Sequence, residues 1–356
     1  MASRHKNCPT ETLETLWGLG MNKNLSEFKR ELQDPNISAE TLTELYLRGR
    51  SAEILVARHP NISRELALTI AAHPEALVRV NLALSVAPRL YLSVLLARDQ
   101  ELNVRAIVAK SASTAPELLE RLSQDQEPSV RSAAANNPNT SPSILEALSQ
   151  DKYEKVVSAV AENPSTPLTV LASLELRQEP SIWGELVRNP SAPPSMLERL
   201  FRNKKVNRED FAKNPSCPAA LLEQLAALDE DAYARRAAAM NPGLPASSME
   251  RLINDERVSV RAAILQNPNC PGALLESVGD PRSLREAFLI ANHSSCPEAL
   301  RAQLAQTEGL EQHLAEESLT EVSLALLLQF TATKDRYLQH LLAKKQRTAL
   351  VRRLLR

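Results

Sequence analysis

Apolar and polar positions alternate along this chain in a pattern that recurs about every 26 residues. In the stretch SVRSAAANNPNTSPSILEALSQD, residues 129–151, a segment rich in Ala precedes an Asn-Pro dipeptide. Ile144, Leu145 and Leu148 then have the three-and-four spacing that places apolar side chains on one face of a helix. Similar stretches occur at residues 103–125 and 259–280. The pattern predicts two short helices in each copy, joined by a polar turn.

The Asn-Pro dipeptide marks the register of these copies, and we call its first residue the anchor. The dipeptide occurs at Asn137-Pro138, Asn163-Pro164, Asn189-Pro190, Asn214-Pro215, Asn241-Pro242 and Asn267-Pro268. Looser copies are assigned to Asp34-Pro35, His59-Pro60, Leu84-Ser85, Lys110-Ser111 and His293-Ser294. Consecutive anchors are 25–27 residues apart. This regularity predicts an array of about eleven repeats.

The ends of the predicted helices follow from the residues at each boundary. Ser141 can cap the first helix of its repeat, and Pro142 suits the first helical position, where no backbone N–H is needed. The second helix must end at Asn136 or Asn137, because the residue before a proline is disfavoured in helical geometry. Helices this short are unstable alone. Stacking of neighbouring repeats must therefore bury their apolar faces, and the predicted fold is an all-α solenoid.

Composition and charge limit the possible classes of protein. Of the 356 residues, 43% are hydrophobic and only 3% aromatic, so Leu, Val, Ile and Ala must form the core. The net charge of −1 gives no general attraction to nucleic acid or to an anionic membrane. We find no signal peptide and no run of 18 apolar residues, and the four cysteines form no disulfide framework. We therefore expect a cytoplasmic protein.

Departures from the repeat predict three regions. Residues 1–30 are expected to form an N-terminal cap, residues 31–300 the solenoid, and residues 301–356 a C-terminal helical cap. Residues 334–356 carry eight Lys and Arg against one Asp, with leucines at helical spacing. This basic amphipathic tail is interpreted as the outer surface of the cap, and the alternative is a helix that binds a membrane, a nucleic acid or the groove of a partner.

The phrase NPxxPxxLLxxLxxDxxxxVRxAxA resembles the leucine-rich repeat variant family over roughly residues 30–300. The resemblance implies a right-handed superhelix of alternating α- and 3₁₀-helices without β-sheet, and it fits a bacterial source. One member of that family has an N-terminal cysteine cluster that holds an iron–sulfur centre. Here the N-terminal region has only Cys8, so this cofactor is not carried over.

Two recurring positions have structural explanations. Cys217, Cys270 and Cys296 each lie two residues after an anchor dipeptide, where other repeats have Thr or Ala, so this is interpreted as a small buried packing position. The anchor Asn is replaced by His or Asp, which can also hydrogen-bond backbone groups. We predict a row of such side chains that satisfies carbonyl and N–H groups between the helices.

A third recurring position holds arginine, and we call these residues the ladder arginines. They are Arg79, Arg105, Arg131, Arg208, Arg235 and Arg261. They form either an outward stripe that binds phosphates or an acidic partner, or ion pairs between repeats. The second interpretation is favoured by a constant six-residue offset from an aspartate, found in Asp99/Arg105, Asp125/Arg131, Asp229/Arg235 and Asp255/Arg261.

Exposed positions that vary between repeats are better candidates for recognising one partner. The residue before the anchor changes freely, and it includes Arg188, Lys213 and Met240. The candidate binding residues are therefore the six ladder arginines together with Arg188 and Lys213. No catalytic motif and no metal-ligand spacing occurs, so we predict no enzyme, no cofactor and no metal. The predicted function is a protein-binding scaffold, and the alternative is a nucleic-acid-binding solenoid that uses the ladder arginines and the basic tail.

Overall fold

The computed structural model describes residues 30–34, 36–85, 90–177, 179–202, 206–228, 230–278 and 281–310, together with Leu326 and Ala343. Its helices are α2 (Ala39–Tyr46), α3 (Arg50–Ala57), α4 (Arg64–Ala71), α5 (Ala76–Ala83), α6 (Leu90–Leu96), α7 (Leu102–Lys110), α8 (Pro116–Leu122), α9 (Pro128–Ala135), α10 (Pro142–Leu148), α11 (Glu154–Glu162), α12 (Leu168–Glu175), α13 (Pro180–Arg188), α14 (Pro194–Arg202), α15 (Arg208–Lys213), α16 (Ala219–Ala226), α17 (Ala232–Met240), α18 (Ala246–Leu252), α19 (Val258–Gln266), α20 (Gly272–Ser277), α21 (Leu284–Asn292) and α22 (Glu298–Leu304). The predicted all-helical repeat solenoid is confirmed, and no strand occurs among the described residues. The predicted caps lie largely outside these residues, as does the basic tail apart from Ala343.

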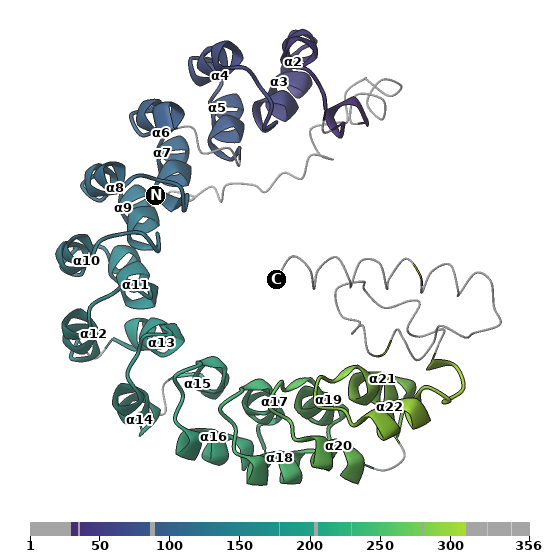
Figure 1. Cartoon of the computed structure of the whole chain (residues 1–356). Helices are drawn as coiled ribbons and strands as arrows, with labels where there is room; N and C mark the ends of the chain where they lie inside the picture. Colours follow the sequence, from purple (N-terminus) through teal and green to yellow (C-terminus); the bar gives the residue numbers. More distant parts are fainter. Residues whose placement is uncertain are drawn as a thin grey trace, which may run out of the picture. The chain divides into compact units, whose positions relative to one another are not determined.

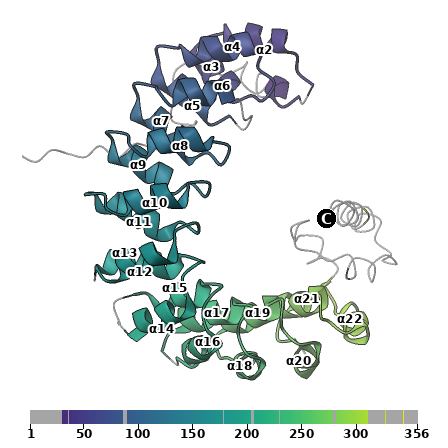
Figure 2. The same ribbon diagram turned by 60° about the vertical axis from the view of Figure 1, so that its left-hand side comes forward.

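The chain forms two compact units, one ending at Ile144 and the other beginning at Leu145. Within each unit, even-numbered labels mark the first helix of a repeat and odd-numbered labels the second (Figure 1). In the first unit the second helices α3, α5, α7 and α9 pack against one another in order. In the second unit α11, α13, α15, α17, α19 and α21 do the same, and the first helices form a separate row (Figure 2).

Helix boundaries agree with the residues predicted to set them. Helix α10 begins at Pro142, and Ser141 Oγ accepts a weak hydrogen bond from the N–H of Ile144 at 3.5 Å. Most second helices of the second unit end at an anchor Asn with extended backbone geometry, as the following proline requires. Both helices of each described pair are α-helical. The 3₁₀ geometry implied by the family resemblance is limited to i→i+3 hydrogen bonds at helix ends, such as Asn163 N–H to Val160 O.

The core lies between the two rows of each unit. First helices contribute leucines, as in α8, where Leu118, Leu119 and Leu122 are buried. Second helices contribute small residues, as in α9, where Ala134 and Ala135 are fully buried. Small side chains let neighbouring second helices approach closely, so no repeat buries its apolar surface without its neighbours.

Five anchor asparagines bind the preceding repeat through hydrogen bonds, one in the first unit and four consecutive ones in the second. The amide Nδ2 of each donates to two carbonyl oxygens of the preceding repeat, one at that repeat's anchor and one two residues before it. Asn189 Nδ2, for example, donates to Ala161 O at 2.7 Å and Asn163 O at 2.8 Å. Its Oδ1 accepts the N–H of Ser191 at 2.8 Å. Asn137, Asn214, Asn241 and Asn267 repeat the two donations. The predicted asparagine row is confirmed.

The structure corrects the anchor register in the first unit. Asn137 Nδ2 donates to Ala109 O and Ser111 O, so Ser111, and not Lys110, is the anchor of the preceding repeat. Ser111 Oγ also receives the N–H of Ser113 at 3.4 Å, as Asn137 Oδ1 receives that of Asn139. The same spacing makes Ser85, and not Leu84, the anchor one repeat earlier. Ser85 and Ser111 were not predicted as anchors, because neither serine is followed by a proline.

Serine at an anchor leaves space that an asparagine would fill. A cavity of about 30 Å³, which includes Ala83, Ser85 and Ser111 in its lining, lies beside the Ser111 hydroxyl. The carbonyls of Ala83 and Ser85 hold the places that accept the anchor amide in other repeats. We expect Ser111→Asn to raise the free energy of unfolding by about 1 kcal/mol, because it adds two hydrogen bonds in a prepared place.

Urea denaturation followed by circular dichroism measures the effect of Ser111→Asn. The matched control is Ser51→Asn, which makes the same substitution at an exposed position of α3, away from the cavity. A stabilisation equal to that of the control, or a loss of stability, would contradict the corrected register.

Arg301 of α22 closes the asparagine row in the second unit. Its buried guanidinium donates from Nε to Ala291 O at 2.9 Å and from Nη2 to His293 O at 3.1 Å. His293 is the last anchor, and its Nε2 lies 2.8 Å from Asn267 O. Arg301 therefore takes the two carbonyls that the anchor amide of a further repeat would take.

Candidate binding surface

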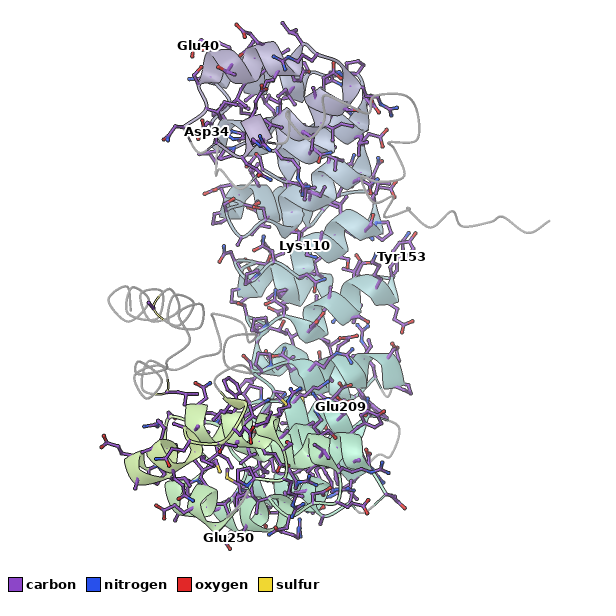
Figure 3. The ribbon with its side chains drawn as sticks, turned by 90° about the vertical axis from the view of Figure 1, so that its right-hand side faces the viewer. Asp34, Glu40, Lys110, Tyr153, Glu209 and Glu250 are labelled. Atoms are coloured by element: carbon purple, nitrogen blue, oxygen red, sulfur yellow. The ribbon has the colours of Figure 1, made fainter. Side chains whose placement is uncertain are left out.

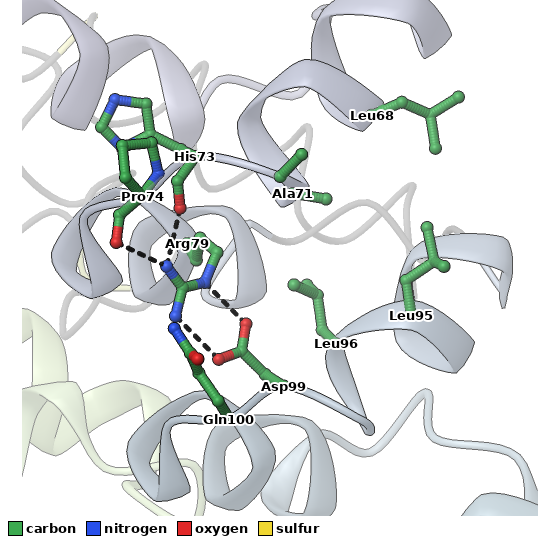
Figure 4. A pocket seen from close by; sticks show the side chains of 10 residues that line it. Leu68, Ala71, His73, Pro74, Arg79, Leu95, Leu96, Asp99 and Gln100 are labelled. Carbon is green, nitrogen blue, oxygen red and sulfur yellow. Dashed lines mark hydrogen bonds and ion pairs between the residues drawn. The ribbon is translucent and has the colours of Figure 1, made fainter.

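Each ladder arginine lies on a second helix, six residues before an anchor. Four of them, Arg79, Arg105, Arg235 and Arg261, are buried. Arg79 donates from Nε to Asp99 Oδ2 at 2.7 Å and from Nη2 to Asp99 Oδ1 at 2.9 Å, and its Nη1 donates to two backbone carbonyls (Figure 4). Such two-point contacts match the planar guanidinium to a carboxylate.

The ion pairs join neighbouring repeats with an offset of twenty residues. Arg105 pairs with Asp125, and Arg235 pairs with Asp255 in the same two-point way. Arg261 instead donates to the buried Glu286, from Nε at 3.1 Å and from Nη2 at 3.0 Å. These four arginines therefore direct their donors into the protein and form no outward stripe.

The six-residue offset between an aspartate and the following ladder arginine reflects a contact with the aspartate backbone and not a side-chain ion pair. Arg105 Nη1 donates to the backbone carbonyl of Asp99 at 2.8 Å, while the Asp99 carboxylate pairs with Arg79. Arg131 likewise donates to the carbonyl of Asp125 at 2.7 Å. The predicted ion pairs between repeats are present, but they do not form within Asp99/Arg105 and Asp125/Arg131, because each carboxylate reaches back to the arginine of the preceding repeat. Asp229 lies outside the described residues.

The carboxyl groups of Asp99, Asp125 and Asp255, which we call the ladder carboxyls, are held ionised by their contacts with the ladder arginines. Burial by itself would raise the pKa of Asp99, Asp125 and Asp255. Hydrogen bonds from a ladder arginine and from a backbone N–H, together with the nearby positive charges, outweigh burial and hold each pKa below its usual value. Carboxyls in this state are weak proton acceptors near neutral pH.

In one repeat a carboxylate and a histidine take the two positions of the ion pair. Glu53 stands at the ladder position of α3, and His73 stands where later repeats have Asp, again twenty residues on. His73 Nε2 lies 3.6 Å from Glu53 Oε2, and its Nδ1 accepts the N–H of Glu75 at 3.1 Å. This pair was not predicted, because the recurring pattern was followed through arginine alone. The twenty-residue offset between Glu53 and His73 is the signal in the sequence that marks it.

The cysteine position is buried, as predicted. Cys217, Cys270 and Cys296 are all free thiols inside the second unit. Burial raises the pKa of Cys217 to about 12 and that of Cys270 to about 11. These thiols are therefore protonated at neutral pH and are poor nucleophiles.

The other predicted binding residues lie in the second unit, on or beside the row of second helices. Arg188, at the end of α13, is exposed and pairs with Glu185 at 2.6 Å and with Asp210 at 3.1 Å. Lys213, at the end of α15, is exposed and pairs with Glu209 at 2.8 Å. Arg208 is partly buried at the first position of α15. Arg188 and Lys213 thus fall on one surface, which the buried ladder arginines do not reach.

A hollow of about 450 Å³ lies between α15 and α17 on this surface. Lys213 and Glu209 line it from α15, and Arg236 and Met240 line it from α17. Figure 3 labels Glu209 of α15, a second helix, and Glu250 of α18, a first helix. We call this hollow the α15–α17 pocket. Arg236 was not among the predicted residues, because a single arginine outside the recurring pattern carries no signal in the sequence.

Two further hollows lie in the first unit beside the loops that join first to second helices. One, of about 430 Å³, has the Arg79–Asp99 ion pair on one side and the exposed Leu68 and Leu95 on another (Figure 4). The other, of about 700 Å³, contains the Arg105–Asp125 pair. The charged groups inside these two hollows already pair with one another, so only the residues at the rims are available to bind a ligand.

In the described part of the chain, no group of three or more His, Cys, Asp or Glu side chains could hold a metal ion. The helices found there are also too short and too polar to cross a membrane.

Comparisons with known proteins concern the fold alone. No family model matches the chain, and no curated protein matches it. Among solved structures, the chain is similar to a leucine-rich repeat variant with a novel repetitive structural motif, at 22% identity and a TM-score of 0.37. This similarity covers 62% of the chain and 88% of that structure. An engineered protein is similar at 13% identity and a TM-score of 0.29, over 88% of the chain and 98% of that structure. The first of the two is of the kind that the repeated motif resembles.

Proposed function

We propose that this chain is a non-catalytic scaffold that binds a protein partner through the exposed surface of its second helices. The observation that carries the proposal is a division between two kinds of position. Residues that recur in many repeats, such as Asn189 and Arg235, are buried and bonded to a neighbouring repeat. Residues that differ between repeats, such as Arg188, Lys213 and Met240, are exposed at the last turn of the second helices.

The chemistry of the buried groups supports a non-catalytic role. The ladder carboxyls are kept ionised by arginine, and the described thiols are kept protonated by burial. Neither group is poised for acid–base or nucleophilic work at neutral pH. Buried free thiols also suit a reducing compartment, so we propose the cytoplasm as its location.

A protein partner is preferred to a nucleic acid because of where the positive charges lie. Four ladder arginines are neutralised by carboxylates inside the protein, so they offer nothing to a phosphate backbone. The exposed Arg188 and Lys213 are also paired with carboxylates. A mixed surface of this kind suits recognition of a protein.

The proposal is tested by affinity capture from extracts of the source organism, followed by chemical crosslinking and mass spectrometry. We expect a protein partner whose crosslinks fall on the second helices, with Lys213 among the linked residues. A salt-titrated gel shift with duplex and single-stranded nucleic acid runs in parallel. Capture of no protein, together with a salt-sensitive shift, would replace the proposal with the nucleic-acid alternative.

A further inference from the structure

We propose that the α15–α17 pocket binds a short acidic and apolar segment of the protein partner. A carboxylate of that segment contacts Arg236, and a neighbouring large apolar side chain packs on Met240. This inference rests on the proposed scaffold function and names the partner's chemistry at one place.

The base of the pocket is apolar and held in a fixed position. Ala212 and Ala237 line it, and the side chain of Met240 is 46% exposed at its edge. The backbone beneath is tied by Asn241, whose Nδ2 donates to Ala212 O at 2.7 Å and to Asn214 O at 2.9 Å. A methionine at the edge of a fixed apolar hollow adapts to apolar side chains of different shape.

The rim of the pocket carries an excess of positive charge. Lys213 is paired with Glu209, whereas Arg236 forms no ion pair with any residue that the structure describes. Arg188 of the neighbouring helix α13 is paired with two carboxylates. Arg236 is therefore the rim cation whose charge is left for a ligand, and its planar fork favours a carboxylate.

This combination is particular to one pair of repeats. At the position of Arg236, the second helices that pack against α17 have Glu209 (α15) and Ala262 (α19), and α13 has Gly184. Helix α15 has 6 residues, whereas α13, α17 and α19 have 9 each. The side chain of Tyr233, which shares a face of α17 with Arg236 and Met240, is 72% exposed. Arg236 therefore lies along α17 between Met240, which lines the pocket, and Tyr233, which lies outside its lining.

The occupant follows from this order of groups along α17. An apolar side chain alone would leave Arg236 without a counter-ion, and a free anion alone would leave Met240 and Tyr233 in water. A segment with Asp or Glu within a few residues of Leu, Ile, Met or Phe satisfies both. At about 450 Å³, the pocket is of a size that holds side chains and not a folded domain.

Selection of peptides from a random displayed library on the full-length protein tests the proposal. We expect enriched sequences that place Asp or Glu beside a large apolar residue. Synthetic fluorescein-labelled versions of these peptides are then titrated against variants. Arg236→Glu should weaken binding at least about tenfold, and Met240→Ser should weaken it by a smaller factor.

Matched controls separate the pocket from general charge and hydrophobicity. Arg285→Glu makes the same charge change at an exposed arginine of α21 that forms no ion pair with a described residue, and Val258→Ser removes an exposed apolar side chain from α19. Both should leave binding unchanged. Circular dichroism melting shows that each variant is folded. Selection of no acidic and apolar motif, or equal loss of binding in Arg236→Glu and Arg285→Glu, overturns the inference.

The two proposals can fail separately. If the captured partner still binds the Arg236→Glu variant and crosslinks elsewhere on the second helices, the scaffold function stands and the pocket assignment is wrong. If another copy of this chain occupies the pocket, sedimentation will show a dimer that Arg236→Glu dissociates. That outcome also overturns the assignment to a separate partner.

Discussion

Replacing Asn189 with alanine is expected to lower the free energy of unfolding by about 3 kcal/mol. The wild-type side chain is fully buried, donates two hydrogen bonds to the preceding repeat and accepts one from Ser191. Alanine leaves the carbonyls of Ala161 and Asn163 and the N–H of Ser191 without this partner in a buried place. Urea denaturation followed by circular dichroism measures the loss.

Two further variants show whether hydrogen bonding causes the effect. Asn189→Asp keeps the shape but replaces the two N–H donors with a carboxylate, which faces two carbonyl oxygens, so we expect it to destabilise at least as much. Asn254→Ala removes an exposed asparagine from the end of α18 and should change the stability by less than about 0.5 kcal/mol. An Asn189→Asp variant as stable as the wild type would refute this account of the row.

Removing a ladder arginine should have a comparable effect. Arg235→Ala is expected to cost about 3–5 kcal/mol, because it leaves the carboxylate of Asp255 partly buried without its counter-ion. Asp255→Asn should cost less, because it leaves a neutral amide in that place. The exposed Arg251 on α18 provides the control, since Arg251→Ala removes the same side chain from solvent.

The same pair predicts a dependence of stability on pH. The pKa of Asp255 in the folded protein lies below its unfolded value, so its contribution is complete above the unfolded carboxyl pKa of about 4. The contribution is lost as the pH falls through the folded pKa. The difference in stability between wild type and Asp255→Asn should therefore shrink as the pH is lowered from 7 towards 3. A difference that is constant over this range would mean that the ion pair contributes nothing.

Much of the fold could be predicted from the sequence because each repeat states its boundaries locally. Proline after the anchor ends one helix, proline a few residues later starts the next, and paired leucines mark the buried face. The role of the anchor side chain also followed from its replacement by His and Asp. Ile144 is the small exception among the core positions, since it is only half-buried beside the fully buried Leu145.

The candidate site was harder to predict, because contacts between repeats have no local signature. The offset between Asp99 and Arg105 was correctly seen to recur, but a constant spacing does not distinguish a carboxylate contact from a backbone one. The anchors Ser85 and Ser111 were misplaced by one residue because they lack the proline that marks the others. Arg236 and Met240 meet Lys213 only when α15 and α17 pack side by side, which depends on how the repeats stack.

The contact of Arg301 has a consequence for solubility. A stack of identical modules would otherwise finish with unsatisfied carbonyl acceptors, which the leading module of a second molecule could engage. By filling those acceptors with the guanidinium of Arg301, the chain blocks head-to-tail polymerisation at that end, much as β-proteins protect their outermost strands from pairing.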